Sequence, residues 1–195
     1  MNMNLNSEYW TERYLQYRSG WDVGEATKPI KQYLDQIRDR QIEILVPGAG
    51  NAYEAIYAFE IGFANTHLLD FSPVPIEQLR ARHPAFPASQ IHLADFFDHQ
   101  GSYDLILEQT FFCALEPVLR PNYVEKASQL LKPGGKLAGV LFDRDFGEAG
   151  PPFGGSQAEY RLIFQKHFEI IKLEECYNSI PPRAGSEVFC IFGKK

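Results

Sequence analysis

Residues 42–53 read IEILVPGAGNAY, and this stretch decides the fold. Its first half, Ile42–Pro47, is a short apolar run of the kind found in buried strands. Gly48 and Gly50 follow directly and permit a tight turn. A helix pattern comes next, with Asn51 as its expected cap and apolar residues recurring on one face. A buried strand, a glycine turn and a helix together form the first unit of an α/β sheet.

The same alternation continues along the chain, with helix signals between strand patterns. Four further strands are predicted at 66–71, 90–94, 103–109 and 136–143. Strands separated by helices are joined by parallel crossovers, so helices should cover both faces of the sheet. The last two strand patterns, 168–174 and 187–192, are separated by CYNSIPPRAGS, which lacks helical periodicity. We therefore predict a single Rossmann-like α/β domain over 1–195, with a seven-stranded, mostly parallel sheet that includes an antiparallel terminal strand.

The composition narrows the classes of function. The 195 residues carry a formal net charge of −6 without a Lys/Arg cluster, so we expect no nucleic-acid partner. The apolar runs are too short to cross a bilayer, and the polar start Met1–Ser7 does not resemble a signal peptide. The three cysteines are widely spaced and form neither a disulfide framework nor zinc-ligand pairs. We therefore expect a cytoplasmic protein with no metal site and no membrane partner.

Two helix patterns precede the first strand, and the first of them places Trp10 and Tyr14 on one face. Both are too short for a separate domain. We expect residues 1–40 to form a helical cover over a ligand site, and residues 41–195 to form the core. The aromatic face can equally be an ordinary packing surface, and its periodicity leaves both interpretations open.

The turn at Gly48 and Gly50 is the first candidate ligand contact. Glycine lets the backbone approach a ligand closely, and the helix N-terminus that follows favours an anionic group. A plain tight turn explains the two glycines as well. The dinucleotide-binding fingerprint requires a third glycine at position 53, where this chain has Tyr53. A nucleotide-dependent oxidoreductase is therefore the weaker alternative.

Two acidic residues follow the second and third predicted strands. Asp70 can accept hydrogen bonds from ribose hydroxyls, or it can cap the helix that begins near Pro73. Asp95 can accept from an adenine amino group while Phe96 packs on the ring; alternatively, the pair is an exposed carboxylate beside a core aromatic. Because both aspartates end parallel strands, they should lie at one edge of the sheet. The sequence predicts a nucleoside-containing ligand there.

Read together, these motifs resemble the thiopurine S-methyltransferase family, and within it the halide/thiol methyltransferases first known from plants. The Leu-Lys-Pro-Gly-Gly turn is shared by many methyltransferases, whereas Gly-Trp-Asp and Phe-Phe-Cys-Ala-x-Glu-Pro are more specific. The segments occur in the family's order. They are Trp10–Tyr14, Gly20–Thr27, Leu45–Gly50, Asp70–Ser72, Asp95–Phe97, Phe111–Pro117, Leu119–Pro121, Leu130–Gly135 and Gly150–Phe153.

The resemblance implies a class I methyltransferase fold that binds S-adenosyl-L-methionine and releases S-adenosyl-L-homocysteine. The N-terminal aromatics would line the cofactor, and the glycine turn would face its methionine part. Asp70 would bind the ribose, Asp95 and Phe96 the adenine, and Gln109 would contact the cofactor near its reacting end. The implied cofactor-binding residues are Trp10, Tyr14, Trp21, Gly48, Gly50, Asp70, Phe71, Asp95, Phe96 and Gln109.

The resemblance further implies a small, soft methyl acceptor: a thiol, hydrosulfide, thiocyanate or halide. A sulfonium methyl is already activated and a thiol is partly ionised at neutral pH, so orientation and exclusion of water suffice and a general base is optional. The loop Gly147–Gly155 is expected either to close over the acceptor or to be a plain turn. The acceptor-site candidates are Trp21, Phe112, Phe142, Asp143 and Phe153.

Two departures from the family pattern bear on the acceptor. Glu108-Gln109 replaces an Asp-Tyr or Asp-Arg pair, and Phe142 stands where the plant-like members carry a tyrosine. The acceptor therefore stays open, and so do two alternative functions. One is a protein that binds S-adenosylmethionine without catalysis, and the other is an O-methyltransferase of a small molecule. We expect a monomer or a weak dimer.

Overall fold

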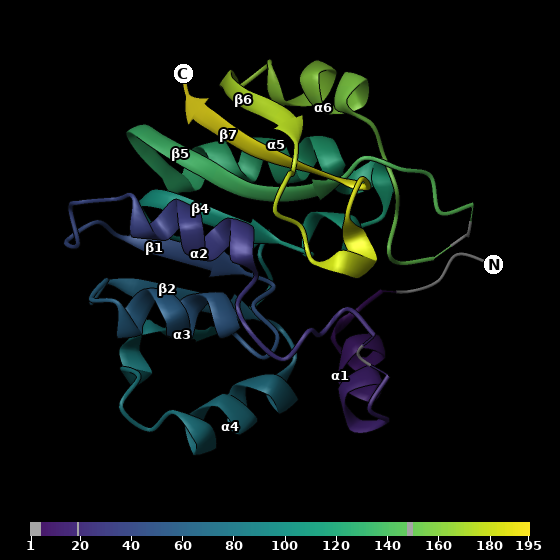
Figure 1. Ribbon diagram of the computed structural model, residues 1–195. Helices are drawn as coiled ribbons and strands as arrows, with labels where there is room; N and C mark the ends of the chain where they lie inside the picture. The colour runs from purple at the N-terminus through teal and green to yellow at the C-terminus, as the bar shows by residue number, and fades with distance from the viewer. Residues whose placement is uncertain (1–4, 19, 148–149) are drawn as a thin grey trace.

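One mixed sheet organises the computed structural model, which describes residues 5–18, 20–147 and 150–195 (Figure 1). Within these ranges seven strands run in the order β3-β2-β1-β4-β5-β7-β6. They are β1 (Ile44–Pro47), β2 (Thr66–Asp70), β3 (Ile91–Leu93), β4 (Tyr103–Gln109), β5 (Leu131–Phe142), β6 (Phe168–Glu175) and β7 (Glu187–Lys194). Strands β1 to β5 pair in parallel, and β7 lies antiparallel between β5 and β6. The predicted mostly parallel sheet with a reversed strand is confirmed.

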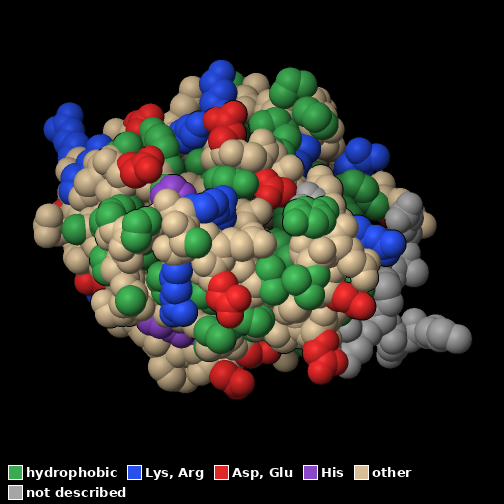
Figure 2. All heavy atoms as spheres, turned by 90° about the horizontal axis from the view of Figure 1, so that it is seen from below, with side chains coloured by type: hydrophobic (Ala, Val, Ile, Leu, Met, Phe, Trp, Pro, Cys, Tyr) green, Lys and Arg blue, Asp and Glu red, His purple; other side chains and the backbone are tan. Residues whose placement is uncertain are grey.

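Helices cover both faces of the sheet, as the strand–helix alternation predicts. The helices are α1 (Ser7–Leu15), α2 (Lys28–Asp35), α3 (Tyr53–Glu60), α4 (Pro73–Arg82), α5 (Arg120–Leu130) and α6 (Gln157–Phe164). Four single 3₁₀ turns lie at Ala88–Gln90, Phe112–Ala114, Pro117–Leu119 and Pro181–Arg183. No helix within the described ranges is long and apolar enough to cross a membrane. Acidic and basic side chains are interspersed over the face shown in Figure 2.

Side chains of the central strands point alternately to the two faces of the sheet and pack into two separate cores, one on each face. Ile44 and Val46 of β1 pack with α2, α3 and α4, whereas Leu45 between them packs in the core of α5 and α6. The second core is largely aromatic, and Phe164 of α6 stacks on Phe192 of β7 with ring centroids 4.2 Å apart. Because strand side chains alternate between faces, a continuous apolar run such as ILV serves both cores.

The turn after β1 is left-handed at alternate positions, and this changes how α3 begins. Gly48, Gly50 and Ala52 have φ of +56°, +51° and +60°. Ala52 is the N-cap of α3 and makes no side-chain cap bond, so the predicted Asn51 cap is wrong. The Asn51 side-chain amide instead donates to Asp22, and this hydrogen bond connects the N-terminal segment to the turn. The sequence pattern cannot distinguish a local cap from such a long-range bond.

The two N-terminal helices take different places. α2 packs into the core beside α3 through its buried residues, whereas α1 has no fully buried residue and lies past the carboxyl ends of the parallel strands (Figure 1). Two hydroxyls attach α1 to the loop after β2. Ser7 Oγ donates to the Phe71 carbonyl at 2.7 Å, and Thr11 Oγ1 lies 2.8 Å from Ser72 Oγ. Of the segment expected to be a cover, α1 is therefore the helix that reaches the ligand edge of the sheet.

Candidate active site

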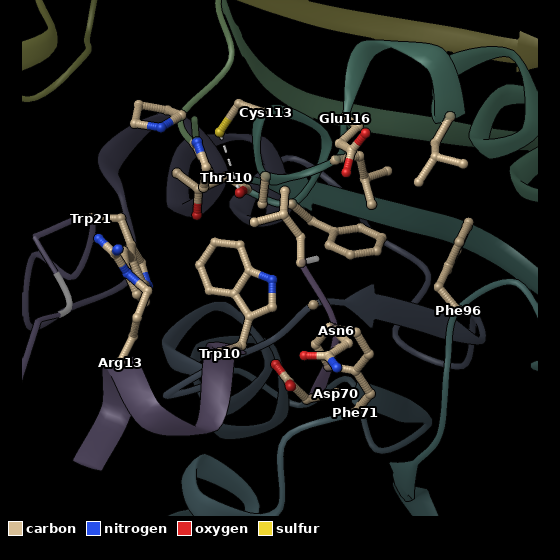
Figure 3. Close-up of a pocket in the computed structure, with 18 of the residues that line it drawn as sticks. Asn6, Trp10, Arg13, Trp21, Asp70, Phe71, Phe96, Thr110, Cys113 and Glu116 are labelled. Atoms are coloured by element: carbon tan, nitrogen blue, oxygen red, sulfur yellow. Dashed lines mark hydrogen bonds between the residues drawn. The ribbon is translucent and has the colours of Figure 1, made fainter. Parts of the chain in front are cut away.

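A cavity of about 560 Å³ lies at the carboxyl edge of the sheet. Its wall comes from α1, from the loops after β1 to β5, and from the β6–β7 connection. Figure 3 shows Trp10 in the middle, with Asp70 and Phe71 on one side and Thr110 and Cys113 on the other. The cavity thus has two ends, a carboxylate end near Asp70 and Asp95 and a second end near Cys113.

Asp70 anchors the carboxylate end. The side chain is buried, with Oδ2 accepting from the Gly50 amide and Oδ1 from the Ser72 amide, both at 2.8 Å. Burial raises the pKa of Asp70, while these amide bonds act in the opposite direction. A carboxylate has about four acceptor positions, so each oxygen retains one for a ligand hydroxyl. Ser72, not Asp70, is the N-cap residue of α4, so the proposed ribose role of Asp70 does not compete with capping.

The glycine turn makes room for aromatic side chains. A Cβ at Gly48 would enter the Phe111 ring, and a Cβ at Gly50 would lie 2.5 Å from Tyr14 Oη. Gly48 lines the cavity, whereas Gly50 lies one layer behind it, under Tyr14. Burial and the nearby charge of Asp70 raise the pKa of the Tyr14 phenol, so it stays neutral at physiological pH.

The end of β3 supplies a second carboxylate and two aromatic rings. Asp95 Oδ1 accepts from the Phe97 amide at 2.8 Å, which turns the chain and leaves the other oxygen of this exposed residue available. Phe96 is buried and stacks on Tyr123 with centroids 5.2 Å apart, so it lines the cavity as the edge of the core. Phe97 also lines the cavity, although its sequence context is equally compatible with a core residue.

The N-terminal aromatics form a cluster across the cavity. Trp21 meets Trp10 and Tyr14 edge-on, with ring centroids 5.3 and 5.8 Å apart. The Arg13 guanidinium carbon lies 5.5 Å from the centroid of the Trp21 ring. All four side chains line the cavity. Aromatic faces that exclude water attract cations, and Arg13 already holds such a position on Trp21, so the aromatic surface for a ligand with a positive centre is that of Trp10 and Tyr14.

The second end of the cavity begins at a strained turn after β4. Thr110 has φ of +61°, which is unfavourable for a β-branched residue. Glu108 stabilises this turn, because Oε1 accepts from the Phe111 and Phe112 amides at 2.9 and 2.8 Å and Oε2 accepts from Tyr123 Oη at 2.6 Å. Burial raises the pKa of Glu108 to about 7.

Arg183 and Phe142 complete the second end. Arg183 is 9% exposed, and its Nη2 donates to the Trp21 carbonyl at 2.7 Å. Its Nη1 lies 3.5 Å from Glu187 Oε1, and its guanidinium carbon lies 5.7 Å from the Phe142 ring centroid. Both Arg183 and Phe142 line the cavity, together with Pro151 and Pro152. This end therefore combines apolar walls with one buried cation.

Five of the predicted site residues lie outside the cavity wall: Gly50, which lies behind it as described above, and four more. Gln109 accepts from Thr27 Oγ1 at 2.8 Å, and Phe112 is buried in the aromatic core. Asp143 accepts from the backbone and side chain of Gln157 at 3.2 and 3.0 Å, so it holds the start of α6. The Phe153 amide donates to the Cys113 carbonyl at 2.7 Å. Of the loop Gly147–Gly155, expected to be either a lid or a plain turn, residues 148 and 149 lie outside the described residues.

The sequence analysis missed Arg183 and Thr110, which line the cavity. A topological signal pointed to Arg183. Because β6 runs parallel to β5, the β6–β7 connection returns to the carboxyl edge of the sheet, and Arg183 is the cation in that connection. The left-handed conformation of Thr110 has no comparable sequence signal.

The fold and the site define a class I S-adenosylmethionine-dependent methyltransferase. In solved structures the same fold occurs in the 1,6-didemethyltoxoflavin-N1-methyltransferase of Burkholderia thailandensis, crystallised with 1,6-didemethyltoxoflavin and S-adenosylhomocysteine. That structure gives a TM-score of 0.75 at 18% identity over 98% of this chain and 87% of that one. A TehB-like methyltransferase from Corynebacterium glutamicum gives 0.65 at 18% identity over 97% and 98%.

Sequence relatives identify the family. Probable thiol methyltransferase 2 of Arabidopsis thaliana is 30% identical over 186 residues, 91% of this chain and 81% of the relative. Thiocyanate methyltransferase 1 of Brassica oleracea is 28% identical over 178 residues, 86% and 76% of the two chains. The model of the thiopurine S-methyltransferase (TPMT) family matches residues 5–192, and the chain belongs to this family.

The cofactor of this methyltransferase is S-adenosylmethionine, and the residues present fit it. The Asp70 carboxylate retains acceptor positions for hydroxyls, and Asp95 retains one for an amino group. The Trp10 and Tyr14 surface of the aromatic cluster suits a sulfonium cation. The carboxylate end therefore matches the nucleoside, and the aromatic cluster matches the charged sulfur.

Proposed function

We propose that this methyltransferase acts on a small, soft nucleophile, namely a thiol, hydrosulfide, thiocyanate or halide, bound at the end of the cavity that Phe142 and Arg183 line. The observation that carries the proposal is the buried guanidinium of Arg183 beside the apolar walls that Phe142, Pro151 and Pro152 form at this end of the cavity. Guanidinium is weakly hydrated and suits large, weakly hydrated anions. Its contact with Glu187, at 3.5 Å, is longer than a normal charged hydrogen bond, so part of its charge is available to an acceptor.

The chemistry of the wall supports a nucleophile that needs little activation. Bound S-adenosylmethionine supplies a methyl group that is already activated. Within the described part of the chain, no histidine lines the cavity. Burial raises the pKa of the Cys113 thiol to about 12, so Cys113 is not a nucleophile at neutral pH. The chain's residues then have to position the acceptor and exclude water, and orientation alone can contribute roughly 7–11 kcal/mol.

The curated relatives support the same acceptor class, because two of those above are a probable thiol methyltransferase and a thiocyanate methyltransferase. Phe142 cannot donate a hydrogen bond, which favours acceptors that need none. We propose further that Trp10, Tyr14, Trp21 and Gly48 surround the methionine part of the cofactor. On this account α1 covers the bound cofactor, and the domain over 1–195 works as one unit.

We also propose a cytoplasmic monomer or weak dimer with no nucleic-acid or membrane partner. All three cysteines are unpaired and buried, which suits a reducing compartment. The net charge of −6 opposes binding to polyanions. The mixed charges on the face shown in Figure 2 support the same proposal.

An acceptor panel tests the proposal. S-adenosylhomocysteine formation is measured with hydrosulfide, thiocyanate, a small thiol and iodide, beside phenols and catechols. We expect turnover with the soft nucleophiles and little with the others. Turnover only with phenols or catechols would identify an O-methyltransferase. Binding of S-adenosylhomocysteine without turnover on any acceptor would identify a binding protein.

A further inference from the structure

A second and much smaller void adjoins the second end of the cavity, near Cys113. Because we place the methyl acceptor there, we call it the acceptor end. Its volume is about 10 Å³, and Thr110, Cys113 and Phe142 belong to the walls of both spaces. Glu108 and Glu187 line the small void but not the main cavity. A single water molecule needs roughly 10–15 Å³, so the void is at the lower limit for one water. Two buried carboxyls are therefore separated from the acceptor end by one layer of side chains.

Glu187 and Glu108 differ in how their oxygens are used. The Glu108 carboxylate accepts two backbone amides and the Tyr123 hydroxyl, so it is committed to the turn after β4. Glu187 is 5% exposed, and its charged partner is Arg183 at 3.5 Å. Glu187 is also directly paired with Phe142 across the β5–β7 ladder, which places the two side chains on one face of the sheet. Glu187 thus lies next to the end of the cavity where the methyl acceptor is proposed to bind, and its carboxylate oxygens can still accept hydrogen bonds.

The surroundings of Glu187 keep its carboxyl able to take up a proton. Burial raises the pKa of Glu187, while Ser179 and the Arg183 cation act in the opposite direction. The other titratable groups around it are the thiols of Cys176 and Cys113 and the Glu108 carboxyl. Burial raises the pKa of each of these as well, so the two thiols stay protonated at neutral pH, while the oxygens of Glu108 are already occupied by the turn after β4.

We propose that Glu187 receives the proton of a protic acceptor, passed through the Thr110 hydroxyl and a water in the small void. The Thr110 hydroxyl donates to the Gln109 carbonyl at 2.7 Å, so it rotates away from that carbonyl to take part. The inference rests on the proposed function, because it concerns thiol and hydrogen sulfide acceptors. In this step the S–H bond breaks and its electron pair stays on sulfur as the thiolate. The proton ends on the Glu187 carboxylate, which becomes a neutral acid and later returns the proton to solvent. Thiocyanate and iodide carry no proton and do not use this route.

The test compares a protic with an aprotic acceptor in one variant. Glu187→Gln keeps the shape of the side chain and removes the proton acceptor, and Glu169→Gln, an exposed position on β6, is the matched control. For a small thiol at pH 6–7, turnover of Glu187→Gln should fall by about 100-fold, the lower end of what a positioned general base contributes. The loss should shrink as the pH approaches the pKa of the thiol, because solvent then supplies thiolate. At saturating thiocyanate, kcat should stay within about twofold because no proton is transferred, whereas the KM for thiocyanate should change because Glu187 contacts Arg183 at 3.5 Å.

Two further measurements separate this role from a structural one. Thr110→Ala should reproduce the selective loss with the thiol, and Thr110→Ser, which keeps the hydroxyl, should restore it. Difference infrared spectra of the cofactor-free protein, wild type minus Glu187→Gln, should show one buried carboxyl that titrates. Equal loss with thiol and thiocyanate, or an unchanged thiol pH profile, would overturn the proposal. A wild-type protein that methylates neither acceptor would overturn the proposed function itself, and the route with it.

Discussion

The two ends of the cavity are built in different ways. At the carboxylate end, Asp70 ends β2 and Asp95 lies two residues after β3. Asp70 is held by the Ser72 amide and by the Gly50 amide of the neighbouring turn after β1, and Asp95 is held by the Phe97 amide. At the acceptor end, Thr110, Phe142 and Arg183 come from three separate strand connections, and long-range bonds such as Arg183 to the Trp21 carbonyl fix them. The carboxylate end is thus a local product of the strand–turn–helix unit, whereas the acceptor end depends on the whole topology.

This contrast explains how one fold can keep a cofactor and change an acceptor. Substitutions in the connections after β5 and β6 alter the acceptor end without touching the amide bonds of Asp70. Substitutions in α1 differ from these, because α1 spans both ends of the cavity and is attached to the loop after β2. Mutation of Asp70 should therefore change cofactor binding alone, and mutation of Arg183 should change acceptor binding alone. Mutation in α1 should change both.

The largest expected effect concerns the buried carboxyl under the acceptor end. The pKa of Glu108 is raised to about 7, so the folded state binds a proton that the unfolded state has released. Wild-type stability should fall as the pH rises from about 4.5 to about 7, with a slope of up to about 1.4 kcal/mol per pH unit. Denaturant unfolding of Glu108→Gln should lack this part of the slope. An identical pH dependence in both proteins would remove Glu108 from the account.

Asp70→Ala breaks the carboxylate end. It removes a buried acceptor of two amides and the proposed ribose contact, so S-adenosylhomocysteine affinity should weaken by about 1–3 kcal/mol. Calorimetry provides the measurement, and the exposed Asp98→Ala is the control. At saturating cofactor the KM for thiocyanate should be unchanged. Unchanged affinity in a folded Asp70→Ala protein would exclude Asp70 from the cofactor site.

Thr11→Val tests whether α1 serves the cofactor. The substitution keeps the side-chain shape and removes the bond to Ser72, with an expected loss of about 0.5–1.5 kcal/mol in S-adenosylhomocysteine binding. Thr11→Ser retains the hydroxyl and should bind as the wild type does. Because α1 has no fully buried residue, the melting temperature should change little. A loss of thermal stability without a loss of affinity would return α1 to a packing role.

Phe142→Tyr has the smallest expected effect and sharpens the acceptor end. The added hydroxyl can donate a hydrogen bond to a bound anion, so the ratio of halide to thiol turnover should shift by a few-fold, about 1 kcal/mol. Competition between iodide and a small thiol in one reaction gives the ratio directly. Complete loss of transfer, instead of a changed ratio, would show that the wall tolerates no hydroxyl and that Phe142 sets shape only.

Sequence reasoning reached the carboxylate end because its determinants are local. The strand, the glycine turn and Asp70 follow each other in the chain, and parallel pairing brings Asp95 to the same edge. It failed where a side chain has a distant partner. Asn51 binds Asp22 instead of capping α3, and Asp143 holds α6 instead of facing the cavity. The strand predicted at 136–143 begins at Leu131, directly after α5, because Leu131 as well as Lys136 pairs with β4.

The central claim is that Arg183 binds the acceptor while Asp70 binds the cofactor. The most direct test is calorimetric titration of thiocyanate into the protein saturated with S-adenosylhomocysteine, where no reaction can occur. Thiocyanate should bind the wild type and Asp70→Ala alike, and binding to Arg183→Met should weaken by about 10-fold or more, the loss of a charged partner. Equal thiocyanate affinity in Arg183→Met and the wild type would contradict the account.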